Sequence, residues 1–251
     1  MSGLPNWARP HFVAGGGDAY LAFAVYGDLP NALAVPGRKY RVGTMPDGLE
    51  VTSHTSGSRS GPDPNRQGAA WDLLLDEHPN LAARIETQSR FVAVNGSIAA
   101  PSDLNYLRDV VGLIQWLFDS GGIATYDPQA LKWWDREEWR DHAFESTTGA
   151  PNHQVVILST NVDNGEWLHT RGMRKYGRPD LSIHSVPREL RTGAVELLRR
   201  FIDFQALGGR IQEGQAIEMN GLPRGMTCAH RGTLDDPDFN NRHLEILWPM
   251  S

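Results

Sequence analysis

The chain has 251 residues, of which 40% are hydrophobic and 22% charged, a composition typical of globular proteins and too apolar for a fully disordered chain. At roughly 150 residues per domain, this length allows one large domain or two small ones. The formal net charge of −6 disfavours general binding to nucleic acid or to an anionic membrane, because phosphate groups repel an acidic protein.

Two sequence features bear on the cellular compartment. The first residues lack a charged and then apolar leader pattern, and no nearby apolar run is long enough to span a bilayer. Cys228 is the single cysteine, so no intrachain disulfide can form, as is usual in a reducing compartment. We therefore expect a cytoplasmic protein without membrane association.

The patterning divides the chain into three segments. Residues 1–52 are rich in β-prone residues and are expected to form a strand-rich N-terminal region. Residues 53–68 contain no aliphatic or aromatic side chain and are predicted to be a flexible polar loop, and residues 69–251 are predicted to form an α+β domain. The Gly15–Gly17 run is interpreted as a turn rather than a cofactor-binding phosphate loop, since no Lys-Ser or Lys-Thr pair follows it, and no cofactor is expected.

The first half of the predicted domain alternates helices and strands. Apolar spacing predicts short helices over residues 71–85, interrupted at Pro79, and then a strand over residues 91–98. An apolar stripe that begins after Ser102 and ends at Phe118 predicts a strong amphipathic helix.

A second group of helix signals follows a short predicted strand over residues 123–126. Asp135 and Glu138 form a capping-box pattern that predicts the start of another helix. The neighbouring tryptophans, Trp133, Trp134 and Trp139, are interpreted as core or staple residues rather than as a partner site.

The second half predicts more strands and one long helix. A strand from His153 and a strand over residues 166–172 are separated by an Asn-Gly pair typical of a hairpin turn. A strand over residues 181–185 leads through Pro187 into an amphipathic helix. Three further strands are predicted, at residues 215–219, 225–231 and 243–248. Together these elements predict a mostly antiparallel sheet with helices on one face, for which a ferredoxin-like arrangement is the preferred single topology.

Candidate binding residues concentrate between Glu166 and Ile183. In a strand, Trp167, His169 and Arg171 would share one face, so that an aromatic ring, an imidazole and a guanidinium could together hold a carboxylate or phosphate. The predicted ligand-binding set comprises Trp167, His169, Arg171, Arg174, Lys175 and Arg178. The alternative is a solvated sheet face whose arginines pair with acidic side chains.

Two functions are compatible with this stretch. The first is a cytoplasmic binding or accessory module that recognises a protein or a small anionic ligand through the basic and aromatic strand face. The second is a hydrolase or nuclease-type enzyme in which His169 acts as acid or base, Arg171 and Arg178 clamp an anion, and Asp180 orients the histidine or a metal. The sequence leaves open whether the protein is an enzyme.

No metal site is predicted, although one arrangement was weighed. Cys228 and His230 would share a strand face and could approach His169, His184 or His243 from neighbouring strands. Because no metal-binding spacing motif accompanies them, we expect Cys228 to be a buried, unreactive thiol.

The segment HTRGMRKYGRPDLSI, which begins at His169, resembles a bacterial domain-of-unknown-function family, number four-two-six-one. The downstream segment RRFIDFQALGGRIQEGQAIEM, which begins at Arg199, contributes to the likeness, and it extends over roughly the C-terminal two thirds of the chain in the order of the elements. The resemblance implies an α+β fold and a cytoplasmic protein, and it transfers no catalytic residue.

Overall fold

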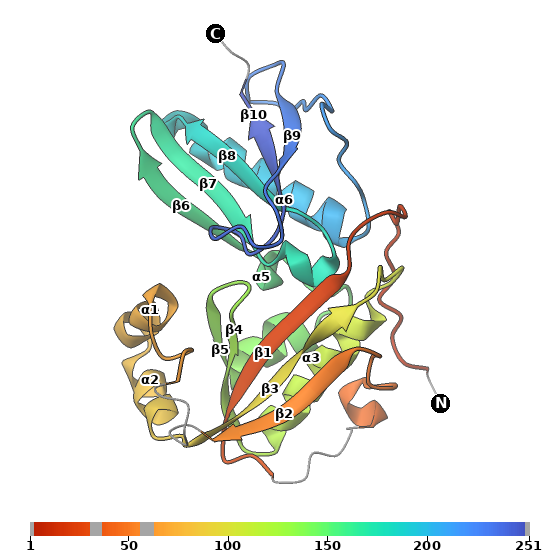
Figure 1. The fold of residues 1–251 in the computed structure, drawn as a ribbon, viewed down its shortest axis with the longest axis vertical. Coiled ribbons are helices and arrows are strands. Elements are labelled where there is room, and N and C mark those ends of the chain that lie inside the picture. Colours follow the sequence, from red (N-terminus) through yellow and green to blue (C-terminus); the bar gives the residue numbers. More distant parts are fainter. Residues whose placement is uncertain (1–2, 31–36, 56–62, 249–251) are drawn as a thin grey trace. The chain divides into compact units, whose positions relative to one another are not determined.

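The computed structural model describes residues 3–30, 37–55 and 63–248, which form two compact units (Figure 1). The first unit is built from the described parts of Met1–Ala8, Tyr20–Ile98 and Leu104–Ala150, and the second from those of Arg9–Ala19, Ala99–Asp103 and Pro151–Ser251. Helices and antiparallel-rich sheets occur in both units, which confirms the predicted α+β class. Each unit has its own five-stranded sheet, where the sequence predicted a single sheet.

The predicted loop at residues 53–68 does not separate the two units. Residues 53–55 belong to a strand of the first unit, residues 56–62 lie outside the described part of the chain, and Asp63 accepts a hydrogen bond of 2.8 Å from the Tyr26 hydroxyl. The last boundary between the units lies near residue 150, and the chain from Pro151 onward belongs to the second unit.

The first sheet has the strand order β2-β3-β1-β4-β5. Antiparallel pairing joins β2 to β3, β1 to β4, and β4 to β5. The strands are β1 (Ala19–Gly27), β2 (Leu49–Thr55), β3 (Arg90–Ile98), β4 (Gly122–Asp127) and β5 (Lys132–Asp135). The sequence pattern did not predict β5, because its two tryptophans were interpreted as staple or core residues just before the helix that Asp135 caps.

Helices cover both faces of this first sheet, whereas one covered face was predicted. The helices α1 (Ala69–Glu77) and α2 (Pro79–Glu86) pack on the face that carries Tyr26, Tyr126 and Trp133. On the opposite face, Trp139 contacts the rings of Phe23, Trp134 and Phe118. The remaining helical elements are η1 (Arg38–Tyr40), α3 (Asn105–Asp119), α4 (Arg136–Trp139) and the π-helix η2 (Arg140–Phe144). The three tryptophans are thus core residues, as predicted.

The second sheet has the order β6-β7-β8-β10-β9, in which only the β8 and β10 pair is parallel among the described pairs. Its strands are β6 (Val156–Val162), β7 (Gly165–Arg171), β8 (Asp180–Val186), β9 (Thr227–Arg231) and β10 (His243–Leu247). The helix α6 (Arg191–Ala206) packs against β7 and β8 (Figure 1). The short helices are α5 (Pro151–Gln154), η3 (Met173–Tyr176) and η4 (Arg188–Leu190).

Neither sheet has the β-α-β-β-α-β order of a ferredoxin-like fold. The predicted strand at residues 215–219 is also absent, since this segment forms only a single bridge between Ile217 and Met226 within a turn-rich stretch. Among the described residues, no helix combines the length and the apolar character needed to cross a membrane.

Candidate functional site

The β7 strand presents two chemically different faces. Leu168 and Thr170 are fully buried on the side covered by α6, which contacts this strand. Trp167, His169 and Arg171 alternate with them on the other side, as the two-residue period of a strand requires. The structure therefore brings together the three residues that the sequence singled out.

Aromatic rings from three parts of the second unit pack around Trp167. Its indole stacks on His169, with ring centres 4.1 Å apart, and on His184 of β8, with centres 5.0 Å apart. Phe239 contacts the edge of His169 at 5.4 Å and stacks on His243 of β10 at 4.1 Å. We call Trp167, His169, His184, Phe239 and His243 the ring cluster. Phe239 was missed by the sequence reasoning, and its only signal was an aromatic residue within a polar turn.

Burial keeps the two enclosed imidazoles of the ring cluster uncharged near neutral pH. His169 is 6% exposed, and this burial, together with the positive charge of Arg171, lowers its pKa to about 4. Burial lowers the pKa of His243 as well. The His169 and His243 rings are therefore largely neutral at pH 7, and arginine supplies positive charge beside them.

Two of the predicted arginines lie at the edge of the ring cluster and hold the loop that carries Phe239. Arg171 donates from Nη1 to the Asp238 carbonyl at 2.5 Å, and Arg174 donates from Nη1 to the Asn240 carbonyl at 3.0 Å. Both side chains remain partly accessible to solvent. They supply positive charge beside neutral rings.

Among the described residues of this face, His169 Nδ1 and Arg171 Nε are buried without a hydrogen-bond partner, while His243 Nδ1 lies 3.8 Å from Asp236 Oδ2. A buried donor or acceptor left unpaired costs about 1–3 kcal/mol. The contacts within the described part of the chain therefore leave the polar atoms of this face incompletely satisfied.

The other two predicted cations are buried and structural. Arg178 donates to the carbonyls of Gly208 at 2.8 Å and Gly209 at 3.0 Å, and it passes so close to Gly16 that a Cβ there would lie 1.6 Å from its Nη1. Lys175 is fully buried, with its Nζ 3.5 Å from Gln154 Oε1. The predicted cations therefore fall into two groups. Arg171 and Arg174 lie at the surface, whereas Lys175 and Arg178 are buried and contact other segments of the chain.

Asp180 is the centre of a buried hydrogen-bond network rather than a partner of His169. It accepts bonds from Thr170 Oγ1 at 2.8 Å, from the Met173 amide at 3.2 Å and from Asn241 Nδ2 at 2.8 Å. Burial raises its pKa to about 6, against the opposing effect of these donors. The histidine and carboxylate of the enzyme alternative therefore lie in one unit without being hydrogen-bonded to each other.

Cys228 and His230 both have protein partners. The buried thiol donates to the Gln212 carbonyl at 3.0 Å, and the His230 ring lies 3.0 Å from the Ile211 carbonyl. Within residues 3–30, 37–55 and 63–248, no three His, Cys, Asp or Glu side chains are grouped so that they could hold a metal ion.

Comparisons with known proteins give no identity for this chain: no family model, curated protein or solved structure matches it. The resemblance to the family of unknown function is thus neither supported nor contradicted.

Proposed function

We propose that the second unit is a protein-recognition module that binds an acidic segment of a partner protein on the ring cluster and its flanking arginines. The observation that carries the proposal is the ring cluster beside the partly accessible Arg171 and Arg174, where His169 Nδ1 and Arg171 Nε have no hydrogen-bond partner among the described residues. A partner carboxylate would accept from Arg171, and a flat partner side chain would pack on the rings.

The packing of the rings favours a protein partner over a small molecule. The ring centre of His169 lies 4.1 Å from that of Trp167 and 5.4 Å from that of Phe239, so no ligand fits between these rings. Small-molecule sites are typically concave, whereas protein interfaces use surface tryptophan and arginine as energetic centres.

The geometry also favours binding over the hydrolase or nuclease alternative. His169 is buried and its pKa is low, which makes it a poor proton donor near pH 7. Asp180, which would orient the histidine, accepts its hydrogen bonds from Thr170, Met173 and Asn241 instead.

We place this activity in the cytoplasm. The single cysteine, Cys228, is a free buried thiol, which suits a reducing compartment. The net charge of −6 supports a protein partner rather than nucleic acid as the target.

Peptide selection tests the proposal directly. A display library of random 12-residue peptides would be selected on the full chain and counter-selected on Arg171→Gln. We expect the enriched peptides to share at least one Asp or Glu next to an aromatic or aliphatic residue. A synthesised peptide should bind Arg171→Gln about tenfold more weakly, because the charge-assisted hydrogen bond is lost.

Arg199→Gln is the matched control, since Arg199 is an exposed cation on α6, which covers the other face of the sheet. It should leave the affinity unchanged. Thermal unfolding of each variant separates a lost contact from a lost fold. The absence of acidic enrichment, or equal affinity of the wild type and Arg171→Gln, would contradict the proposed function.

A further inference from the structure

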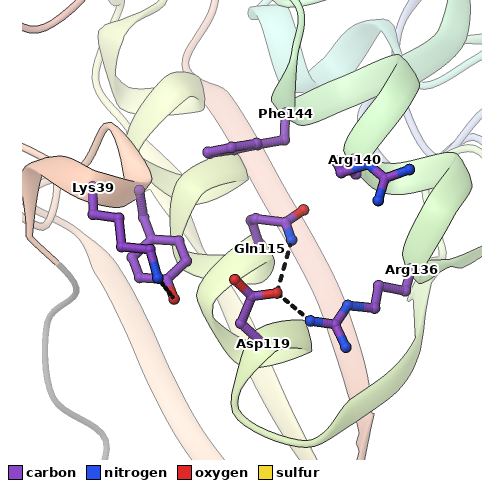
Figure 2. A pocket seen from close by; sticks show the side chains of 7 residues that line it. Lys39, Gln115, Asp119, Arg136, Arg140 and Phe144 are labelled. Atoms are coloured by element: carbon purple, nitrogen blue, oxygen red, sulfur yellow. Dashed lines mark hydrogen bonds and ion pairs between the residues drawn. The ribbon is translucent and has the colours of Figure 1, made fainter.

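The first unit contains a pocket of about 290 Å³ between four helical elements (Figure 2). Its walls come from η1, the C-terminal half of α3, α4 and the π-helix η2. The lining side chains are Lys39, Tyr40, Gln115, Asp119, Arg136, Arg140 and Phe144. Nothing in the proposed function of the second unit uses these residues.

Two aromatic residues, Tyr40 and Phe144, line the pocket, and the backbone of each is anchored. Tyr40 approaches α3 closely because that helix has a glycine at position 112, where a Cβ would lie 1.9 Å from the Tyr40 carbonyl oxygen. Phe144 ends the π-helix, and its ring lies 4.7 Å from the guanidinium of Arg41, which also donates to the Phe144 carbonyl. Single π-helical turns occur frequently at functional sites. The backbone of Tyr40 is therefore positioned by its close approach to Gly112, and Phe144 is positioned by the Arg41 side chain.

The lining carries more positive than negative charge, although the whole chain is acidic. Lys39, Arg136 and Arg140 face one carboxylate, Asp119, which is already paired with Arg136. Arg140 also pairs with Asp141 at 2.9 Å, outside the lining, and half of its side chain remains exposed. Asp119 and Asp141 offset Arg136 and Arg140, so an anionic group would be attracted by Lys39 and by the exposed part of Arg140.

The lining of the pocket includes the amide side chain of Gln115, a residue that is 5% exposed. Its Nε2 donates to Asp119 Oδ1 at 3.2 Å, and a carboxylate can only accept, so the amide nitrogen must face Asp119. Its Oε1 then points the other way, toward the space between Phe144 and Arg140, as Figure 2 shows. This oxygen is buried and has no hydrogen-bond partner.

We propose that this pocket binds a small planar molecule that has a ring N–H donor and a single anionic group. The ring N–H would donate to Gln115 Oε1 and satisfy the buried acceptor. The ring would pack against Tyr40 and Phe144, and the anion would be held by Arg140 and Lys39. A volume near 290 Å³ is at the lower end for ligand sites, which limits the ligand to one or two fused rings.

Calorimetric titration of the full chain with three matched probes tests each part of this assignment. Indole-3-acetate has the ring N–H and the carboxylate, 1-methylindole-3-acetate lacks the N–H donor, and indole lacks the anion. Uridine monophosphate tests whether a phosphate on a ring with an N–H donor is accepted in place of the carboxylate. We expect indole-3-acetate to bind, and loss of either feature to weaken its affinity about tenfold.

Two variants connect the probes to the residues. Gln115→Met keeps the side-chain length but removes Oε1, so it should weaken indole-3-acetate about tenfold and leave the already weak 1-methyl analogue nearly unchanged. A purely structural role of Gln115 would weaken both probes equally. Arg140→Gln should weaken indole-3-acetate about fivefold and leave indole unaffected.

Arg200→Gln is the control, because Arg200 is an exposed arginine of the other unit that also pairs with a carboxylate, Glu196. It should bind indole-3-acetate as the wild type does. Backbone amide shifts on titration should be confined to η1, α3, α4 and η2. Failure of both indole-3-acetate and uridine monophosphate to bind at 10 mM, or equal losses for both indole acids in Gln115→Met, would overturn the assignment. Neither result would affect the peptide-binding proposal, which concerns the other unit.

Discussion

The buried carboxyl of Asp180 makes a measurable prediction about the dependence of stability on pH. Burial raises its pKa from 3.8 to about 6 in the folded protein. Between these values the folded state binds more protons than the unfolded state, so the free energy of unfolding falls as pH rises. From pH 4.5 to 7.5 this one group lowers the stability of the second unit by about 2 kcal/mol.

The substitution Asp180→Asn isolates this effect. The amide has the same size and does not ionise. Its NH₂ group would meet either the Asn241 donor at the Oδ2 position or the Thr170 and Met173 donors at the Oδ1 position, and this mismatch costs stability at every pH. The wild-type advantage over the variant should therefore be about 2 kcal/mol larger at pH 4.5 than at pH 7.5. His169, whose stability contribution has the opposite pH dependence, is present in both proteins and cancels in the difference.

Hydrogen exchange read at peptides from β7 and β8 in increasing urea provides the assay, since it reports on this unit alone. Asp235→Asn, in an exposed loop of the same unit, controls for the removal of a surface carboxyl. Stability curves for the wild type and Asp180→Asn that run parallel from pH 4.5 to 7.5 would refute the reasoning.

Three further predictions concern particular contacts. Gly112→Ala should destabilise the first unit by about 1–3 kcal/mol in thermal unfolding, because the added Cβ would overlap the Tyr40 carbonyl. This cost should outweigh the better helix propensity of alanine. Unchanged stability would show that α3 and η1 are not in close contact. The imidazole of His169 should titrate below pH 5 by NMR, and a midpoint at pH 6 or above would contradict its burial by the ring cluster. Cys228 is buried, and burial raises the pKa of its thiol. Its reaction with a thiol reagent should therefore be no faster than the unfolding of the second unit. Rapid labelling of the native protein would refute this.

Strand faces, the hairpin turn and a helix cap could be predicted from the sequence, because each depends on residues that are close together along the chain. The two-residue period placed Trp167, His169 and Arg171 on one face, and the Asn-Gly pair placed the hairpin turn before Gly165. Asp135 caps the next helix by accepting from the Glu138 amide at 2.8 Å. These outcomes follow from backbone geometry and short-range hydrogen bonds, which a single segment contains.

The roles of the basic residues could not be predicted in the same way. Arg171 and Arg178 belong to one basic run, yet one lies at the surface and the other is buried. The difference arises from the carbonyls of Gly208 and Gly209, thirty residues away, which satisfy the Arg178 guanidinium. A charge can be buried only where the fold supplies such acceptors, and no local pattern records them.

By itself, the sequence determined the class of elements, the position of the β7 strand and the chemistry of its face. Only the tertiary structure decided that there are two sheets, that Phe239 completes the ring cluster, and that Gln115 lies in a pocket with Tyr40 and Phe144. Periodicity reports which side of a segment is apolar, and that is a local property. Which segments meet depends on long-range packing, where distant side chains satisfy each other's buried surfaces and polar atoms.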